Sequence, residues 1–391
     1  MGGQAALSTS VLLGSLAGTA HAGDAGSPGR IRITVIGDSY TSGEGASAGT
    51  YRTVQVTGPD GVSVINAIDP AHQSASAPTL QALSQITRNN PNVTFDVTFV
   101  PVSGATRDSL YQTTRPGTEF EHSPQIDAVN GADIVIVGIG GNDARFGDLA
   151  RTMVTSQEST TEAAFSNLMS PLQNGAYLNE QVDVYRDIAN RMAPDGTIVT
   201  LGYPQVLPNE VPEGSPSPAS EALISSREAQ LANEFGATIN SLNRQATQLA
   251  AEATGASFLH ADVSQALSGH ELFMPQEGLN GLDFLNLQGS YHPNALGQTL
   301  IANVLTPTVN HAVVHELGTQ GLVGPPTPHS LPLPTIDAPP TANPPMDWPP
   351  YEPAPVSPPM DPGGGEPFPE LPPPDLGVGE PAPDPVPEVC I

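Results

Sequence analysis

The chain has 391 residues and is strongly acidic, with 12 Lys and Arg against 40 Asp and Glu and no Lys at all. This length allows one sizeable hydrophobic core plus additional segments. The net charge of −28 makes nucleic acids and anionic membrane surfaces poor partners. Because Cys390 is the single cysteine and the nine His residues lack metal-binding spacing, we expect neither an internal disulfide nor a metal site.

The first 22 residues resemble an export signal. A short apolar run, 11–17, precedes Ala20-His21-Ala22, which has the pattern of a cleavage site. No basic residue precedes the apolar run, so a frayed N-terminus is the alternative interpretation. No later run reaches the roughly 18 apolar residues of a transmembrane helix. We therefore expect a secreted or cell-surface protein without stable membrane insertion.

The segment 31–36 is apolar and largely β-branched, which predicts a buried strand, and Gly37 permits a sharp turn after it. A hairpin is expected at 53–65, either as a wall of a substrate cleft or as a solvent-facing decoration. A Pro- and Ser-rich loop is expected at 207–219.

The remaining elements alternate along the chain. The pattern predicts helices at 77–86, 145–192 (with polar breaks), 231–249 and 295–317, and strands at 93–100, 133–139, 197–201 and 256–260. Alternating strands and helices imply a parallel sheet of about five strands with helices on both faces. Ligands of such sheets bind beyond the carboxyl ends of the strands.

The composition changes abruptly at residue 325. Of the 43 prolines, 25 lie between 325 and 391, together with ten acidic and no basic residues. Such a segment cannot bury a core, so we expect it to be extended or disordered. It could serve as a spacer for cell-wall or surface association, as an arm for domains that bind Pro-rich ligands, or as a solvating tail without a specific partner.

Four residues together have the chemistry of an acyl-transfer site, which needs a nucleophile, a base and donors for an oxyanion. Ser39 follows the first strand, and Gly104 and Asn142 follow the next two, where a backbone N–H and a side-chain amide can act as donors. His292 precedes the last helix and can fold back as a base. Each signal alone fits an ordinary turn or a structural His, but the four in this order indicate catalysis.

At these positions the chain resembles the SGNH (GDSL) hydrolase family, over roughly 31–310. The matching stretches are Gly37-Asp38-Ser39, Ser103-Gly104-Ala105, Gly140-Gly141-Asn142-Asp143 and His292-Pro293-Asn294. The secreted actinobacterial esterase and lipase branch is the most similar, in the stretches Ser39 to Gly45, Gly202-Tyr203-Pro204 and Gly269-His270-Glu271.

The resemblance implies a flavodoxin-like three-layer α/β/α sandwich at 23–324, after a signal peptide at 1–22 and before the disordered Pro-rich tail at 325–391. It also implies a serine esterase without a cofactor. Carried over residue by residue, Ser39 is the nucleophile and His292 the base. The backbone N–H groups of Ser39 and Gly104 and the side chain of Asn142 form the oxyanion hole.

The chain departs from the family pattern in two ways. Many members have Asp three residues before the catalytic His, where this chain has Gly289, so the imidazole must be oriented otherwise. In the resembling branch a main-chain carbonyl can orient the imidazole, and the Ser290 carbonyl is the matching candidate here, with Asp283 as the less favoured alternative. Secreted relatives also carry disulfides, at positions that here are small or apolar, such as Ala71 and Phe273.

The sequence therefore predicts a secreted, monomeric carboxylesterase or lipase acting on small-molecule or lipid esters. A carbohydrate or cell-wall deacetylase and a phospholipase are alternatives, because the same fold supports several reactions. A catalytically idle surface-binding protein, with the Pro-rich tail as its stalk, is an alternative from another class.

Overall fold

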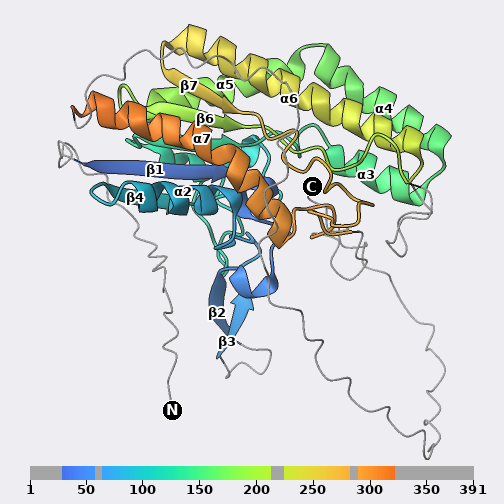
Figure 1. Ribbon diagram of the computed structural model, residues 1–391, viewed down its shortest axis with the longest axis horizontal. Helices are drawn as coiled ribbons and strands as arrows, with labels where there is room; N and C mark the ends of the chain where they lie inside the picture. The colour runs from blue at the N-terminus through green and yellow to red at the C-terminus, as the bar shows by residue number, and fades with distance from the viewer. Residues whose placement is uncertain (1–28, 58–63, 213–223, 282–288, 322–391) are drawn as a thin grey trace, which may run out of the picture. The chain divides into compact units, whose positions relative to one another are not determined.

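A parallel sheet of five strands forms the middle layer of the structure (Figure 1). In spatial order the strands are β4 (Thr94–Phe99), β1 (Arg30–Gly37), β5 (Ile134–Gly138), β6 (Thr197–Leu201) and β7 (Ser257–Ala261). The computed structural model describes residues 29–57, 64–212, 224–281 and 289–321, which all belong to one compact unit. The predicted α/β fold with five parallel strands is confirmed.

The strand order places β1 and β5 side by side at the point where the sheet changes its winding direction. From β1 the chain moves outward to β4, and it then returns to the other side of β1 to form β5. In doubly wound sheets the connections diverge at this point and leave a crevice beyond the carboxyl ends of the strands. The segments that follow β1 and β5 therefore flank that crevice.

Helices cover both faces of the sheet. Four helices pack on the sheet: α2 (Pro78–Asn89), α5 (Ala176–Arg191), α6 (Ser226–Thr254) and α7 (Ala295–Thr319). Successive side chains of a strand point to opposite faces. Accordingly, Ile134 and Ile136 pack with residues of α2 and α7, whereas Val135 and Val137 pack with residues of α5 and α6 (Figure 1). The two apolar layers fix the position of the sheet between the helices.

Other helices and a hairpin make up the rest of the described secondary structure. These are the four-residue α1 (Ser39–Ser42), α3 (Phe146–Thr155), α4 (Glu158–Gln173), three 3-10 helices (Ala48–Thr50, Asp108–Tyr111 and Gln125–Val129), and the hairpin β2 (Thr53–Thr57) and β3 (Val64–Ile68). The expected helical region 145–192 is thus three helices, and the hairpin extends to residue 68. None of the described helices is long and apolar enough to cross a membrane.

Helix α6 begins five residues earlier than its apolar stripe predicts. Ser225 and Glu228 form a capping box, in which each side chain accepts a hydrogen bond from the backbone N–H of the other residue. This exchange satisfies backbone donors at the start of a helix, so a polar first turn is stable without contributing to the stripe. Gly255, in the left-handed conformation, ends the helix.

Two further expectations from the sequence concern the positions of missing disulfides and the segments outside the sheet and its helices. Ala71 and Phe273, at positions where the resembling branch carries disulfides, are each 1% exposed and pack in the core. The segments 1–22 and 325–391, expected as a signal peptide and a disordered tail, lie outside the described residues, as does most of the loop expected at 207–219.

We predict that Gly37→Ala strongly destabilises the fold. Gly37 has a φ of +146°, and a Cβ at this position would lie 2.2 Å from the carbonyl oxygen of Gly138. Backbone strain and overpacking should together cost about 2–4 kcal/mol. The matched control is Gly49→Ala, since a Cβ on exposed Gly49 meets no atom within 4 Å. Denaturant unfolding measures both variants, and equal stabilities would contradict the prediction.

Candidate active site

The chain turns sharply after β1 and presents Ser39 at the start of α1. Asp38 caps this short helix, because its Oδ1 accepts a hydrogen bond from Tyr40 N at 3.1 Å. The backbone N–H of Asp38 donates to the carbonyl of Gly138 at 2.9 Å, which ties the turn to the end of β5. Ser39 is 0% exposed, and within the described residues its Oγ has no hydrogen-bond partner. Among the described residues, this hydroxyl is therefore not committed to a structural hydrogen bond.

Tyr203 joins the Ser39 turn to the Gly-rich loop that follows β5. Its hydroxyl donates to Asp38 Oδ2 at 2.5 Å and accepts from Gly141 N at 2.9 Å. Burial raises the pKa of Asp38 to about 7, although the hydrogen bonds from Tyr203 and from Tyr40 N act in the opposite direction. One phenol thus fixes two neighbouring loops and supports a buried acid.

Gly104 and Asn142 lie in loops that contact each other. Gly104 has a φ of +82°, which a glycine adopts without strain, and the Asn142 side-chain amide donates to the carbonyl of Ala105 at 2.9 Å. An ion pair between Arg107 and Asp143 reinforces the contact, with Nε and Oδ1 3.2 Å apart. Burial raises the pKa of Asp143, and the Arg107 guanidinium offsets part of that rise. The two expected hydrogen-bond donors, Gly104 N–H and the Asn142 amide, thus lie on two loops that these contacts hold together.

His292 is fully buried in the loop before α7. Its Nδ1 lies 3.0 Å from the carbonyl oxygen of Ser290, which can accept a hydrogen bond from the imidazole. The imidazole ring is 5.2 Å from the ring of Tyr40, the neighbour of Ser39 in the chain, and the Tyr40 hydroxyl donates to the carbonyl of Tyr291. These contacts bring the His loop to the Ser39 turn.

A second set of hydrogen bonds holds the His loop. The backbone N–H of Asn280 donates to the carbonyl of His292, and that of Tyr291 donates to the carbonyl of Asn280, both at 2.9 Å. Gln298 Nε2 donates to the carbonyls of Glu44 and Pro293, each at 2.8 Å. The other expected orienting residue, Asp283, lies outside the described residues.

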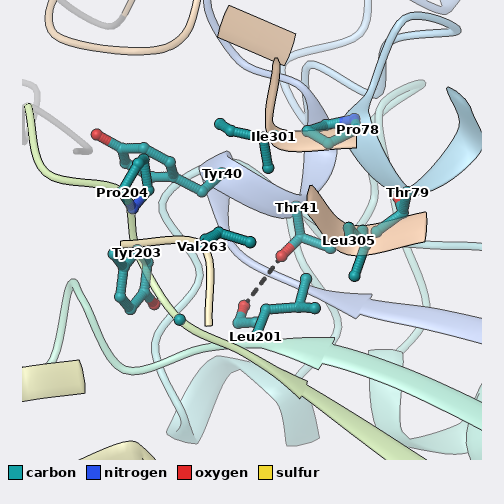
Figure 2. Close-up of a pocket in the computed structure, with 12 residues that line it drawn as sticks. Tyr40, Thr41, Pro78, Thr79, Leu201, Tyr203, Pro204, Val263, Ile301 and Leu305 are labelled. Atoms are coloured by element: carbon teal, nitrogen blue, oxygen red, sulfur yellow. Dashed lines mark hydrogen bonds between the residues drawn. The ribbon is translucent and has the colours of Figure 1, made fainter. Parts of the chain in front are cut away.

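A small apolar cavity lies beside α1 (Figure 2). It encloses about 20 Å³ and is lined by side chains that include Tyr40, Thr41, Tyr203, Ile301 and Leu305. Figure 2 shows Tyr40 and Tyr203 together at one end of this cavity, where their rings are 5.5 Å apart and perpendicular. A space of this size holds about one water molecule and cannot hold an acyl chain.

The sequence motifs predict residues for chemistry but not the side chains that hold their loops together. They assign no role to Tyr203, Arg107 or Asp143, although Tyr203 and Asp143 lie within the motif stretches 202–204 and 140–143. Their partners are far away in the chain, with Tyr203 165 residues from Asp38 and Arg107 36 residues from Asp143. In the described ranges, no group of three or more His, Cys, Asp or Glu could hold a metal ion.

Comparisons with known proteins agree with one another. Residues 33–305 match the family model of GDSL-like lipases and acylhydrolases. A lipase from Streptomyces rimosus is 29% identical over 303 residues, which cover 76% of this chain and 94% of that protein. Lipase 1 from Streptomyces coelicolor is 29% identical over 273 residues, which cover 68% of this chain and 81% of that protein.

Solved structures have the same fold. A crystal structure of an extracellular lipase from Streptomyces rimosus has a TM-score of 0.52 and 26% identity, and covers 72% of this chain and 99% of that one. A phospholipase A1 from Streptomyces albidoflavus NA297 has a TM-score of 0.52 and 22% identity, and covers 72% of this chain and 98% of that one. The likeness to the phospholipase shows the fold alone.

We predict that Asn142→Ala lowers kcat about 10²–10³-fold with little change in KM, because an amide that binds an oxyanion acts mainly in the transition state. Asn190→Ala is the matched control, since Asn190 is exposed near the C-terminal end of α5. Steady-state kinetics on one activated ester would measure both variants. An Asn142→Ala enzyme as active as the control would exclude this side chain from the reaction.

Proposed function

This chain belongs to the family of GDSL-like lipases and acylhydrolases and is an ester hydrolase, and from this we propose that it is a secreted serine enzyme that cleaves acyl esters through an acyl-enzyme. The observation that carries the proposal is that two loops joined through Tyr40 carry a buried Ser39, at the start of α1, and a buried imidazole whose Nδ1 faces a carbonyl. A nucleophile, a base and an orienting group are the parts such a reaction requires.

In the proposed reaction, Ser39 Oγ attacks the ester carbonyl carbon while His292 Nε2 accepts the hydroxyl proton. The carbonyl π electrons move to oxygen and form a tetrahedral oxyanion. When the oxyanion collapses, the C–O bond to the alcohol breaks, and the imidazolium returns its proton to the departing alkoxide. His292 then takes a proton from water as the water attacks the acyl-enzyme carbonyl carbon. The bond between this carbon and Ser39 Oγ breaks, the imidazolium returns the proton to Ser39 Oγ, and the acid leaves.

Three donors would stabilise the oxyanion: the N–H groups of Ser39 and Gly104 and the amide of Asn142. The hydrogen bond from Asn142 to Ala105 and the ion pair between Arg107 and Asp143 support this assignment, because they hold the donors in place before the substrate arrives. Donors that need no reorganisation contribute most to transition-state stabilisation.

The Ser290 carbonyl would orient the imidazole. A carbonyl 3.0 Å from Nδ1 fixes the proton on that atom and leaves Nε2 to act as the base. A carbonyl stabilises the imidazolium less than a carboxylate does, so the proposed enzyme works with a weaker orienting group than many relatives. We expect a modest loss of rate rather than inactivity, because the oxyanion donors act independently.

Export is the third part of the proposal. The apolar run and Ala20-His21-Ala22 support a signal peptide at 1–22, and the Streptomyces rimosus structure is described as an extracellular lipase. The catalytic domain would span 23–324, and the Pro-rich segment 325–391 would extend from it, with surface association as one role. We propose a monomer without a cofactor, acting on a small-molecule or lipid ester.

Initial rates on p-nitrophenyl esters from acetate to palmitate test the reaction. We expect hydrolysis that is lost in Ser39→Ala, because the nucleophile is removed, and retained in Ser166→Ala, which changes an exposed serine of α4. The best chain length would choose between acetyl esterase, esterase and lipase. Inactivity on every ester would favour a sugar or cell-wall ester, and failure to react with a fluorophosphonate as well would favour an idle binding protein.

A second experiment tests how the base is oriented. If the Ser290 carbonyl holds His292, Asp283→Asn should change kcat by less than tenfold, because the side chain at 283 has no part in the reaction. Steady-state kinetics across the pH range would measure it. A loss of more than about 100-fold would show that Asp283 supplies the orienting carboxylate instead.

A further inference from the structure

Glu44 is a buried carboxylate beside the candidate site, two residues beyond the end of α1, and the proposed reaction assigns it no role. It is 1% exposed. Its Oε2 lies 2.5 Å from His72 Nδ1, and its Oε1 accepts a 3.5 Å hydrogen bond from the hydroxyl of Tyr51. The hydroxyl of Ser103, the neighbour of Gly104, also hydrogen-bonds to this carboxylate. The Glu44 side chain thus forms hydrogen bonds with residues of three separate segments.

The carboxylate is negatively charged at neutral pH. Burial alone would raise the pKa of Glu44, but the hydrogen bonds from His72 and Ser103 oppose burial. The electrostatic attractions of His292 and His72 also lower the pKa of Glu44, and together these interactions bring it below its usual value. Burying an anion is costly without such partners. Because these partners offset that cost, the Glu44 carboxylate stays ionised.

Glu44 is also physically joined to the His loop. A Cβ on Gly45 would lie 2.7 Å from the Cβ of His292, so the backbone next to Glu44 packs directly against the base. Gln298 bridges the carbonyls of Glu44 and Pro293, and Asn280 Nδ2 donates to the carbonyl of Gly45 at 2.7 Å. These contacts fix the backbone at Glu44 and Gly45 against the His loop.

This arrangement matters because position 289 carries no carboxylate. When Ser39 gives up its proton, His292 becomes a cation inside a buried site. The Ser290 carbonyl offers only a dipole to that cation. In a low-dielectric interior, an anion acts on a neighbouring cation even without direct contact.

We propose that Glu44 is a positioning residue that supplies through space the negative charge that Gly289 lacks, and so stabilises the imidazolium of His292. The inference rests on the proposed function, in which His292 is the base. Glu44 acts through the imidazole and does not touch the substrate. Among the described residues, the titratable groups that interact with Glu44 include His72, Tyr51 and His292.

The pH dependence of kcat/KM tests the proposal. In Glu44→Gln the imidazolium loses its stabilising anion and gives up its proton more readily, so the acid limb should move to lower pH. We expect kcat to fall about tenfold at the same time. Glu44→Met is a second uncharged variant of similar length, for use if the amide prevents folding. An acid limb at the wild-type pH in the uncharged variant would overturn the proposal.

Three variants separate charge from structure. Glu44→Asp keeps the charge and should keep the wild-type acid limb. His72→Gln removes a partner but leaves the carboxylate, so the limb should not move to lower pH. Asp69→Asn removes another carboxylate that is 1% exposed, held by His122 and Arg52, and it should lower stability without moving the limb. The same downward movement in any of these variants would show a structural effect and refute the charge hypothesis.

NMR titration of the His292 imidazole in the full chain measures the same effect without turnover. The resonance is assigned by its loss in His292→Gln. We expect its midpoint to lie at lower pH in Glu44→Gln than in the wild type. An unchanged midpoint would overturn the proposal even in an active esterase. Esterase activity that survives Ser39→Ala would instead refute the proposed function, so the two failures are distinguishable.

Discussion

The close approach of β1 and β5 at their carboxyl ends is the constraint on which the rest of the site depends. Gly37 and Gly138 lie opposite each other, and the carbonyl of Gly138 accepts hydrogen bonds from Asp38 N and from Thr41 Oγ1. A side chain at Gly37 would occupy the same space as this carbonyl. Because the strands meet without side chains, the turn with Ser39 and the loop with Asn142 leave the sheet side by side, at the point where the winding direction changes.

Buried acids surround this point, and each has a specific partner in a chain that has few cations. Asp38 is supported by the Tyr203 hydroxyl, Asp143 by the Arg107 guanidinium, and Glu44 by His72. A buried charge or acid is tolerated only when such partners satisfy it. Because the partners come from other loops, each acid is satisfied only when those loops pack together, and this favours the assembled site. These buried acids therefore help to link the loops of the site, whereas the net charge of −28 affects which partners can bind to the surface.

The sequence was sufficient for the parts of the structure that are encoded locally. Apolar periodicity located all five strands of the sheet within a few residues, and alternation with helices implied their parallel pairing. The start of α6 was missed because the capping box, not the apolar stripe, determines it. Four of the proposed site residues were recognised from short stretches around Ser39, Gly104, Asn142 and His292. What the sequence could not reveal is pairing across loops, as between Tyr203 and Asp38, because neither residue's neighbours indicate its partner.

The same distinction bears on how a site could depart from its family pattern and still support the proposed chemistry. A motif such as the Asp three residues before a catalytic His describes one position in the sequence. The stability of an imidazolium depends instead on the combined electrostatic field of all the charges around it. The orienting hydrogen bond and the negative charge are separable: a carbonyl at Ser290 can provide the first, and a carboxylate on a different loop can provide the second. In this chain Glu44 lies 245 residues before Gly289 in the sequence, yet its backbone packs against the His loop. Whether a missing motif residue weakens an enzyme thus depends on the charges that the fold brings to the same place.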